Sequence, residues 1–170
     1  NNAVWLATSL GLFNYYNNKL TRVLPDSINV LQAEWHNNHE LFILTPGNLF
    51  LFDIKTGKLT NLIKNNNAQN FFASSLYFDK KNNMLWIGTM SGVLFYYKTK
   101  TNELKTINQS IIPQQPISAI ENISDTSLML GIDGQGIWEI NKYTQKILNV
   151  YTDNPDDPLS LKGNGIYDIY

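Results

Sequence analysis

The chain has 170 residues, of which 43% are hydrophobic and 16% are charged, so it can form a core with fewer charges than the usual share of about 25%. The formal net charge of -1 argues against nucleic acid or an anionic membrane surface as a partner. The sequence has no cysteine, which excludes thiol catalysis, disulfides and cysteine-ligated metal, and no stretch approaches the 18 apolar residues of a membrane helix.

Short segments rich in β-branched and aromatic residues follow one another along the chain, and Gly, Asn and Pro separate them. Glycines occupy the turns in which a hairpin needs positive φ. No segment of ten or more residues predicts a helix. In chain order, the expected strands are 4–8, 12–16, 20–24, 28–33, 41–45, 49–53, 59–63, 73–78, 85–89, 93–97, 104–107, 117–120, 128–132, 137–141, 147–151 and 166–170.

Four of these strands can be stacked on one another, because each has a similar apolar pattern: 4–8, 41–45, 85–89 and 128–132. Their second residues are Trp5, Phe42, Trp86 and Met129, which are 37, 44 and 43 residues apart. A repeat of about 40–45 residues made of short strands is typical of a β-propeller blade. We therefore predict an all-β fold, a β-propeller fragment of about four blades, each a four-stranded antiparallel meander.

Each blade is expected to hold four strands, A to D in chain order, of which the stacked segments are the B strands. The chain then starts at a B strand and ends at an A strand, so we expect a mature or excised fragment without a signal peptide. We predict a single domain over 1–170, either a closed four-blade ring or an arc of a larger ring. The blade repeats are approximately 1–24, 25–64, 70–108 and 114–152, with a final strand in 164–170 that belongs to a next or closing blade.

The segment Leu85-Trp86-Ile87-Gly88-Thr89-Met90-Ser91-Gly92-Val93-Leu94-Phe95-Tyr96 resembles the two-component regulator propeller repeat. The polar turn at 78–83 and the linker at 154–161 are also similar to that family, and together the repeats cover nearly the whole chain. The second and fourth repeats depart from the pattern, with Phe42 and Leu44 in one and Met129 and Ile132 in the other.

Members of that family are usually the periplasmic sensor part of bacterial hybrid two-component systems, and many of them bind oligosaccharides. The resemblance therefore implies a ligand-sensing extracytoplasmic module that responds to a carbohydrate and signals to a kinase outside this chain. It implies a periplasmic location, no enzymatic activity in this fragment and no cofactor. A non-signalling interaction scaffold and, behind it, a polysaccharide-active enzyme are the alternatives. We also expect self-association or contact with the remainder of a propeller.

The tryptophans of the B strands could stack on sugars, but their recurrence at blade spacing favours packing between blades. Trp35 lies outside this register, in what reads as an enlarged polar loop, and is the better binding candidate because loops on rigid scaffolds carry recognition. His36 and His39 stand in the same loop. They could ligate a metal with Glu34 or Glu40, but no third ligand is specified, so we predict no metal site.

A second candidate is the turn Asp133-Gly134-Gln135-Gly136, which reads as one residue longer than its counterparts. Asp133 and Gln135 could hydrogen-bond a sugar hydroxyl there. Trp138 occupies a C-strand position, so core packing is its expected role. The acidic loop with Asp153, Asp156 and Asp157 is expected to be solvated rather than catalytic. The predicted ligand-binding residues are thus Trp35, His36, His39, Asp133 and Gln135, and no catalytic residue is predicted.

Overall fold

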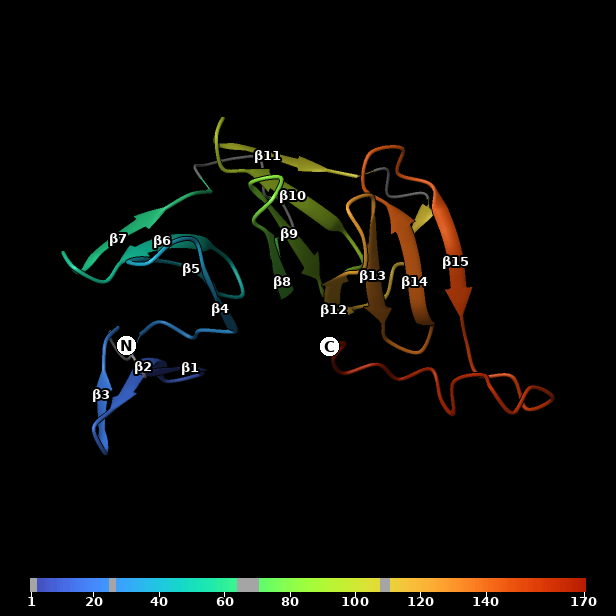
Figure 1. Cartoon of the computed structure of the whole chain (residues 1–170), viewed down its shortest axis with the longest axis horizontal. Coiled ribbons are helices and arrows are strands. Elements are labelled where there is room, and N and C mark those ends of the chain that lie inside the picture. The colour runs from blue at the N-terminus through green and yellow to red at the C-terminus, as the bar shows by residue number, and fades with distance from the viewer. Residues whose placement is uncertain (1–2, 25–26, 64–70, 108–110) are drawn as a thin grey trace. The chain divides into compact units, whose positions relative to one another are not determined.

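The computed structural model describes residues 3–24, 27–63, 71–107 and 111–170, and this part of the chain is all-β, with no α-helix (Figure 1). No helix in the described ranges is long and apolar enough to cross a membrane. The fifteen strands are β1 (Val4–Thr8), β2 (Gly11–Tyr16), β3 (Lys19–Arg22), β4 (Gln32–Trp35), β5 (Glu40–Leu44), β6 (Leu49–Asp53), β7 (Lys58–Asn61), β8 (Ala73–Asp79), β9 (Met84–Thr89), β10 (Leu94–Lys98), β11 (Glu103–Thr106), β12 (Ile117–Asn122), β13 (Ser127–Ile132), β14 (Gly136–Asn141) and β15 (Ile147–Tyr151).

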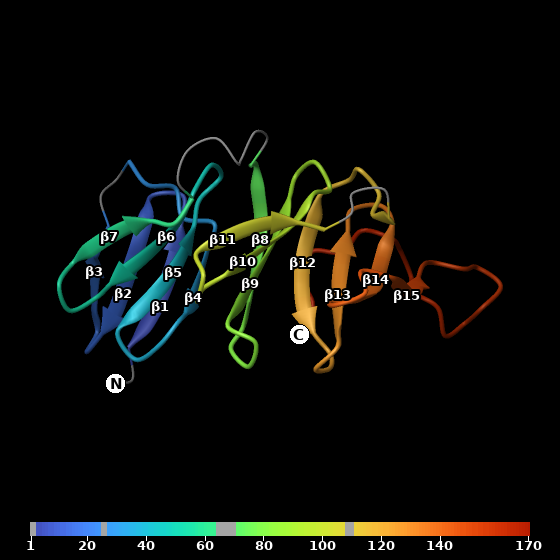
Figure 2. The ribbon, with the colours of Figure 1, turned by 90° about the horizontal axis from the view of Figure 1, so that it is seen from above.

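These strands form four antiparallel sheets, each a meander of strands consecutive in sequence (Figure 2). Blade 1 is β1-β2-β3, blade 2 is β4-β5-β6-β7, blade 3 is β8-β9-β10-β11 and blade 4 is β12-β13-β14-β15. The expected all-β fold, a propeller fragment of about four blades, is confirmed. Parts of the expected blade boundaries, at 1–2, 25–26, 64–70 and 108–110, lie outside the described residues.

Two expected strands differ from the structure. The last one, 166–170, is not part of any strand. The A strand of blade 2 begins at Gln32 rather than Ile28, because the backbone N–H of Val30 donates to Thr8 O of blade 1 (2.9 Å) and its side chain enters the core. Ile28 and Val30 therefore pack into the core, whereas Leu31 is exposed and its backbone N–H donates to Leu44 O of β5 (2.9 Å).

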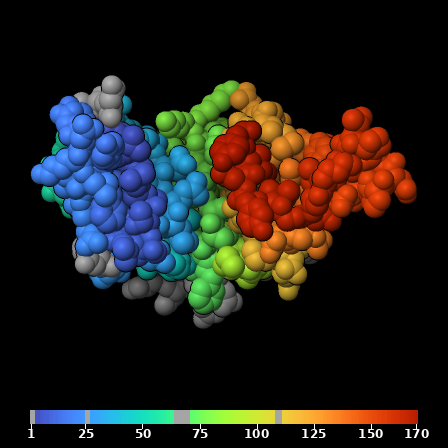
Figure 3. Space-filling model, turned by 90° about the horizontal axis from the view of Figure 1, so that it is seen from below, coloured from blue at the N-terminus to red at the C-terminus, as the bar shows by residue number. Residues whose placement is uncertain are grey.

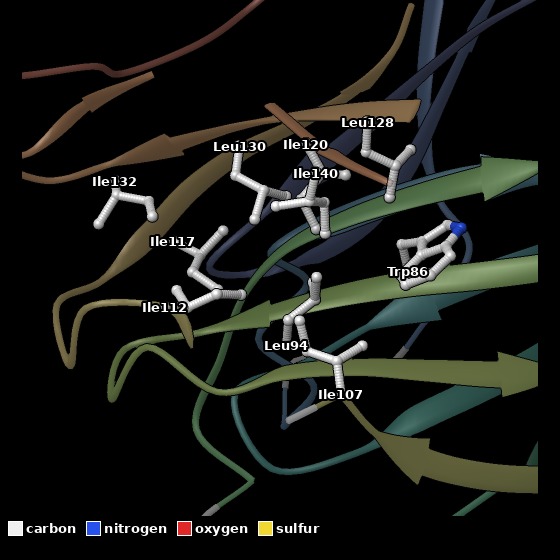
Figure 4. Close-up of a cluster of buried hydrophobic side chains, with 10 residues drawn as sticks. All are labelled: Trp86, Leu94, Ile107, Ile112, Ile117, Ile120, Leu128, Leu130, Ile132 and Ile140. Carbon is white, nitrogen blue, oxygen red and sulfur yellow. The ribbon is translucent and has the colours of Figure 1, made fainter. Parts of the chain in front are cut away.

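The chain divides into two compact units, Asn1–Phe71 with blades 1 and 2 and Phe72–Tyr170 with blades 3 and 4. Each unit has its own core. In the first, Leu12, Leu41 and Phe52 are buried together, and Trp5 and Trp35 pack against them. In the second, Trp86 is buried among the aliphatic side chains drawn in Figure 4, which come from both blades of that unit.

The threonine at the end of each B strand closes the following turn in blades 1 to 3. The Oγ1 of Thr8 donates to Gly11 O (2.8 Å), that of Thr45 to Asn48 O (3.0 Å) and that of Thr89 to Val93 O (2.9 Å). Blade 4 has Ile132 at this position, and its turn instead uses two glycines with positive φ, Gly134 and Gly136. The same B–C turn is thus formed in two ways, by a threonine hydrogen bond in blades 1 to 3 and by glycines with positive φ in blade 4.

A small residue in the B strand lets the next segment of the chain pack closely against blades 3 and 4. A Cβ on Gly88 would lie 2.7 Å from Ile117 Cγ2, and one on Gly131 would lie 2.6 Å from Ile166 Cγ2. Serine hydroxyls complete both junctions, since Ser75 donates to Ile117 O (2.8 Å) and Ser118 donates to Ile166 O. The end of the chain, dark red in Figure 3, therefore meets blade 4 as β12 meets blade 3.

Two of the four large B-strand residues are buried as expected, and the other two, Trp5 and Met129, are half-buried. Trp86 and Phe42 are 1% and 2% exposed, and the Trp86 ring lies 5.6 Å from that of Tyr96. Trp5 is half-buried, with its ring edge-on to Trp35. Because such side chains are enclosed by protein, the interpretation of this series as packing is confirmed for Trp86 and Phe42.

Candidate functional site

Trp35 is not a loop residue. It is the last residue of β4, pairs with Leu41 of β5 and is half-buried with its ring 5.9 Å from that of Trp5. The equivalent pair in blade 3 is Phe78 and Leu85. The turns between the strands are 36–39 in blade 2 and 80–83 in blade 3, so the loop after Trp35 is not enlarged. The expectation of an off-register loop tryptophan is wrong, because β4 runs further toward the turn than its apolar pattern indicates.

His36 and His39 lie together in the β4–β5 turn. The backbone N–H of His36 donates to Glu40 O (3.0 Å), and its ring lies 4.8 Å from the Phe42 ring. Asn37 Oδ1 accepts from the backbone N–H groups of His39 and Glu40, both at 3.0 Å. The side chain of Asn37 thus determines the shape of this turn, as asparagine commonly does in hairpins.

Asp133 and Gln135 lie in the β13–β14 turn of blade 4, in the other compact unit from the histidines. The backbone N–H of Asp133 donates to Pro116 O (2.9 Å), and the Trp138 indole N–H donates to Gln135 O (3.1 Å). Counted from the last residue of the B strand pattern to the residue that stands opposite it, the B–C turn of blade 4 covers 132–136. It is one residue longer than the turns of blade 1 (8–11) and blade 2 (45–48) and as long as that of blade 3 (89–93). The expected extra length therefore holds against blades 1 and 2 only.

A polar surface that the sequence did not predict lies at the opposite end of blade 4, where β14 turns into β15. Asn141 Oδ1 accepts from the backbone N–H groups of Tyr143 (3.0 Å) and Thr144 (2.8 Å), which closes the turn. Tyr143 is 60% exposed. Its hydroxyl lies 3.4 Å from Asn82 Oδ1 of the blade 3 turn and 3.3 Å from Asp125 O of the blade 4 turn. The hydroxyl of Tyr143 is thus anchored while most of the residue remains exposed to solvent.

A buried ion pair lies directly beside this turn. Lys142 Nζ donates to Asp79 Oδ2 of blade 3 (2.7 Å) and to Asn122 Oδ1, and Asp79 and Lys142 are only 5% and 8% exposed. Asn82 adds hydrogen bonds to both carboxylate oxygens of Asp79, from its N–H (3.1 Å) and its Nδ2 (2.8 Å). Burial raises the pKa of Asp79, but the hydrogen bonds and the Lys142 charge outweigh it, and the net pKa is lowered.

Charged and hydroxyl side chains lie in the two turns that the Tyr143 hydroxyl contacts. Lys81 and Asp125 form an exposed ion pair, and Ser124 is an exposed residue whose hydroxyl is hydrogen-bonded to Ser127 within its own turn. We call Lys81, Asn82, Ser124, Asp125 and Tyr143 the Tyr143 surface. All five belong to turns of blades 3 and 4 within one compact unit. The arrangement offers an aromatic face for an apolar or C–H-rich ligand face, together with donors and acceptors for hydroxyl groups.

One break in the sequence repeat points to this surface. The turns between C and D strands in blades 2 to 4 are 54–57, 99–102 and 142–145, and their second residues are Lys55, Lys100 and Tyr143. Blade 4 departs from the repeat here, because it has the aromatic residue Tyr143 where blades 2 and 3 have lysine. Its partners Asn82 and Asp125 come from other turns, so only the fold reveals the surface.

No protein-family model matches the chain, and no curated protein sequence matches it. Solved structures do match. One is the extracellular domain of BT4673 from B. thetaiotaomicron, described as a hybrid two component system, with a TM-score of 0.79, 22% identity and coverage of 100% of this chain and 23% of that chain. Another is the corresponding domain of BT3049 from B. thetaiotaomicron, with a TM-score of 0.73, 19% identity and coverage of 100% and 22%.

The computationally designed Ika8 protein is a further match, with a TM-score of 0.64, 16% identity and coverage of 89% of this chain and 46% of that chain. The chain thus spans less than a quarter of the two natural extracellular domains. At these identities the likeness is one of fold. The natural proteins that share this fold are described as hybrid two-component systems, and the repeat at 85–96 resembles the propeller repeat of such regulators.

Proposed function

We propose that this chain is part of a ligand-sensing extracytoplasmic module of a hybrid two-component regulator and that its ligand is a carbohydrate. The observation that carries the proposal is the match of the whole chain, at TM-scores of 0.73 and 0.79, to extracellular domains described as belonging to such systems. The signalling kinase would lie outside this chain, and the location would be the periplasm.

The Tyr143 surface is the proposed ligand contact. A tyrosine anchored at its hydroxyl loses little conformational freedom on binding, because only two torsions orient its ring. Amide, carboxylate, ammonium and hydroxyl groups beside it can pair with the many hydroxyls of a saccharide. The predicted contacts Asp133 and Gln135 remain proposals for a second, separate surface, as do His36, His39 and Trp35.

The same contact suggests how binding could be transmitted. The Tyr143 hydroxyl reaches the A–B turns of both blade 3 and blade 4, and Lys142 beside it is paired with Asp79 of blade 3. A ligand bound at this position would touch both blades, so its affinity would depend on their packing. By linkage, a ligand that favours one packing shifts the population toward it.

The test is a glycan array probed with the chain, followed by calorimetry on any glycan retained. We expect Tyr143→Ala to weaken binding about tenfold, which is about 1.4 kcal/mol, and Tyr143→Phe to retain most of it because the ring remains. Tyr167→Ala, at an exposed tyrosine of the same unit, is the matched control and should change nothing.

Failure to retain any glycan would contradict the carbohydrate proposal. Binding that is equally strong in Tyr143→Ala would leave the carbohydrate function standing and move the contact elsewhere, with Asp133→Ala and Gln135→Ala as the next variants.

A further inference from the structure

We propose that His39, Glu40 and Asp53 of blade 2 form a binding site for a zinc-like divalent transition metal. One ligand atom from each side chain lies within 4.8 Å of the other two, and all three residues are half-buried. The sequence predicted no metal here because the third ligand, Asp53, is 13 residues beyond Glu40. Strand pairing supplies it, since Glu40 of β5 stands directly opposite Asp53 of β6.

The histidine that completes the set is His39 and not His36. His36 turns its ring onto Phe42, and the cluster found among the described residues does not include it. Glu34, the other acidic residue considered with the histidines, accepts a hydrogen bond from Gln32 Nε2 (3.3 Å) and is also outside the cluster. The proposed site thus has one imidazole and two carboxylates, and it differs from the pair of histidines that the sequence analysis considered and did not predict as a metal site.

Existing hydrogen bonds hold the ligands in place before any metal arrives. Asn37 Nδ2 donates to Glu40 Oε2, while Asn37 Oδ1 accepts from the backbone of His39 and Glu40. Asp53 Oδ1 accepts from the backbone N–H groups of Lys55 (2.8 Å) and Thr56 (3.2 Å). Hydrogen bonds of this kind orient metal ligands, and their loss typically weakens metal affinity by about 10- to 100-fold.

Charge favours a bound cation at this position. Carboxylates directly opposite one another on paired strands repel. Lys58 of β7 stands opposite Asp53 on its other side, but within the described ranges its ammonium forms no ion pair with that carboxylate. Lys58 therefore does not neutralise the repulsion between the carboxylates of Glu40 and Asp53. A divalent ion bound between them would.

The donor set selects the metal class. Calcium takes six to eight oxygen ligands and magnesium keeps most of its water, whereas zinc readily combines imidazole with carboxylates in four-coordinate sites. Three protein ligands leave a fourth position for water or for a group from outside the chain. This site is independent of the proposed sensor function and lies in the other compact unit from the Tyr143 surface.

The test is calorimetric titration of the chain with zinc chloride after chelator treatment, with cobalt as a spectroscopic substitute. We expect one zinc per chain and the visible absorption bands of four-coordinate cobalt. His39→Gln and Asp53→Asn should each weaken zinc binding at least about tenfold. Asp53→Asn keeps the Oδ1 acceptor of the turn, and circular dichroism without metal verifies that each variant is folded.

The matched controls are His36→Gln, which removes the other histidine, and Asp156→Asn, which makes the same chemical change in an exposed loop. Both should bind zinc as the unchanged chain does. The proposal is overturned if the unchanged chain binds no zinc, if it binds calcium in preference to zinc, or if His39→Gln and Asp53→Asn bind zinc undiminished.

Discussion

Single small residues decide how closely neighbouring segments pack in this protein. Gly88 is the clearest case, because a Cβ there would lie 2.3 Å from Ser75 Oγ and 2.7 Å from Ile117 Cγ2. Since Ser75 and Ile117 are buried and held to each other by a hydrogen bond, neither can move away freely. The glycine of the Trp-Ile-Gly-Thr pattern is thus a packing requirement between blades rather than a turn signal.

Gly88→Ala should therefore destabilise the chain by about 1–3 kcal/mol, the usual cost of overpacking a core. Urea unfolding measures this change. Gly165→Ala is the control, because a Cβ at Gly165 would meet nothing within 4 Å. Equal stability of the two variants would show that the junction between β9 and β12 adapts more easily than its distances indicate.

The ion pair between Asp79 and Lys142 is a second feature at the residue scale. Removing one partner of a buried pair leaves an uncompensated charge, so we expect Asp79→Ala to cost about 3–5 kcal/mol. Asp125→Ala removes the exposed partner of Lys81 and should change stability little, because solvent screens such pairs. Chemical denaturation measures the free energy of unfolding of both variants. An equal loss of stability in the two would contradict the argument that the buried ion pair contributes more than the exposed one.

At the scale of elements, the D strands differ in how they protect a sheet edge. Three of them, β3, β7 and β11, have the sequences KLTR, KLTN and ELKT, with lysine in each. The fourth, β15, reads ILNVY without a charge, and all five residues are exposed. Natural edge strands commonly carry lysine because it opposes pairing with another chain.

We accordingly expect concentration-dependent self-association through β15, with a second copy of the chain as the partner. Val150→Lys should lower the associated fraction in sedimentation or light scattering. Thr60→Lys introduces the same charge on β7, which already has Lys58, and should leave the association unchanged. A chain that stays monomeric at high concentration, or that associates equally well as Val150→Lys, rules out this edge.

The sequence predicted the B and C strands well and the A strands less well. B and C strands form the centre of each blade, so their apolar pattern and the Gly and Thr of the turn leave a strong local signal. The predicted A strand of blade 2 differs from β4 because Ile28 and Val30 are apolar for packing in the core and not for strand pairing. For the same reason the apolar pattern predicts an end of β4 before Trp35, which the structure places within the strand.

The candidate sites were harder to predict because each depends on strand register. Asp79 and Lys142 are 63 positions apart, and Tyr143 reaches Asn82 across 61 positions. Local spacing contains no information on such pairs. His39 and Glu40 are neighbours in sequence, but the sequence predicts no metal site there, because Asp53 joins them only through the pairing of β5 with β6.

At the scale of the whole molecule, the shifted pKa values define a pH range of stability. The lowered pKa values of Asp53 and Asp79 mean that the unfolded chain binds more protons in acid. Their contribution is present above the unfolded pKa of about 4 and is lost as the pH falls through the lower folded values. Burial raises the pKa of Tyr97, so its contribution is lost as the pH rises above about 10.

We therefore expect a broad maximum of stability between about pH 4 and pH 10, measured by thermal unfolding in a pH series. Tyr97→Phe should flatten the alkaline side, because the buried ring then has no proton to lose, while leaving the acid side unchanged. Retention of full stability well below pH 3 would contradict the acid side of this expectation.

The contact of Ile166 with blade 4 has a consequence for engineering. Ser75, Gly88 and Ile117 make one junction, and Ser118, Gly131 and Ile166 make the next with the same chemistry. A blade could thus be exchanged as a cassette between proteins of this fold, provided that the serine, the glycine and the incoming isoleucine are retained at each seam. Chimaeras that keep these three residues should assemble, whereas chimaeras that align only the strands should not.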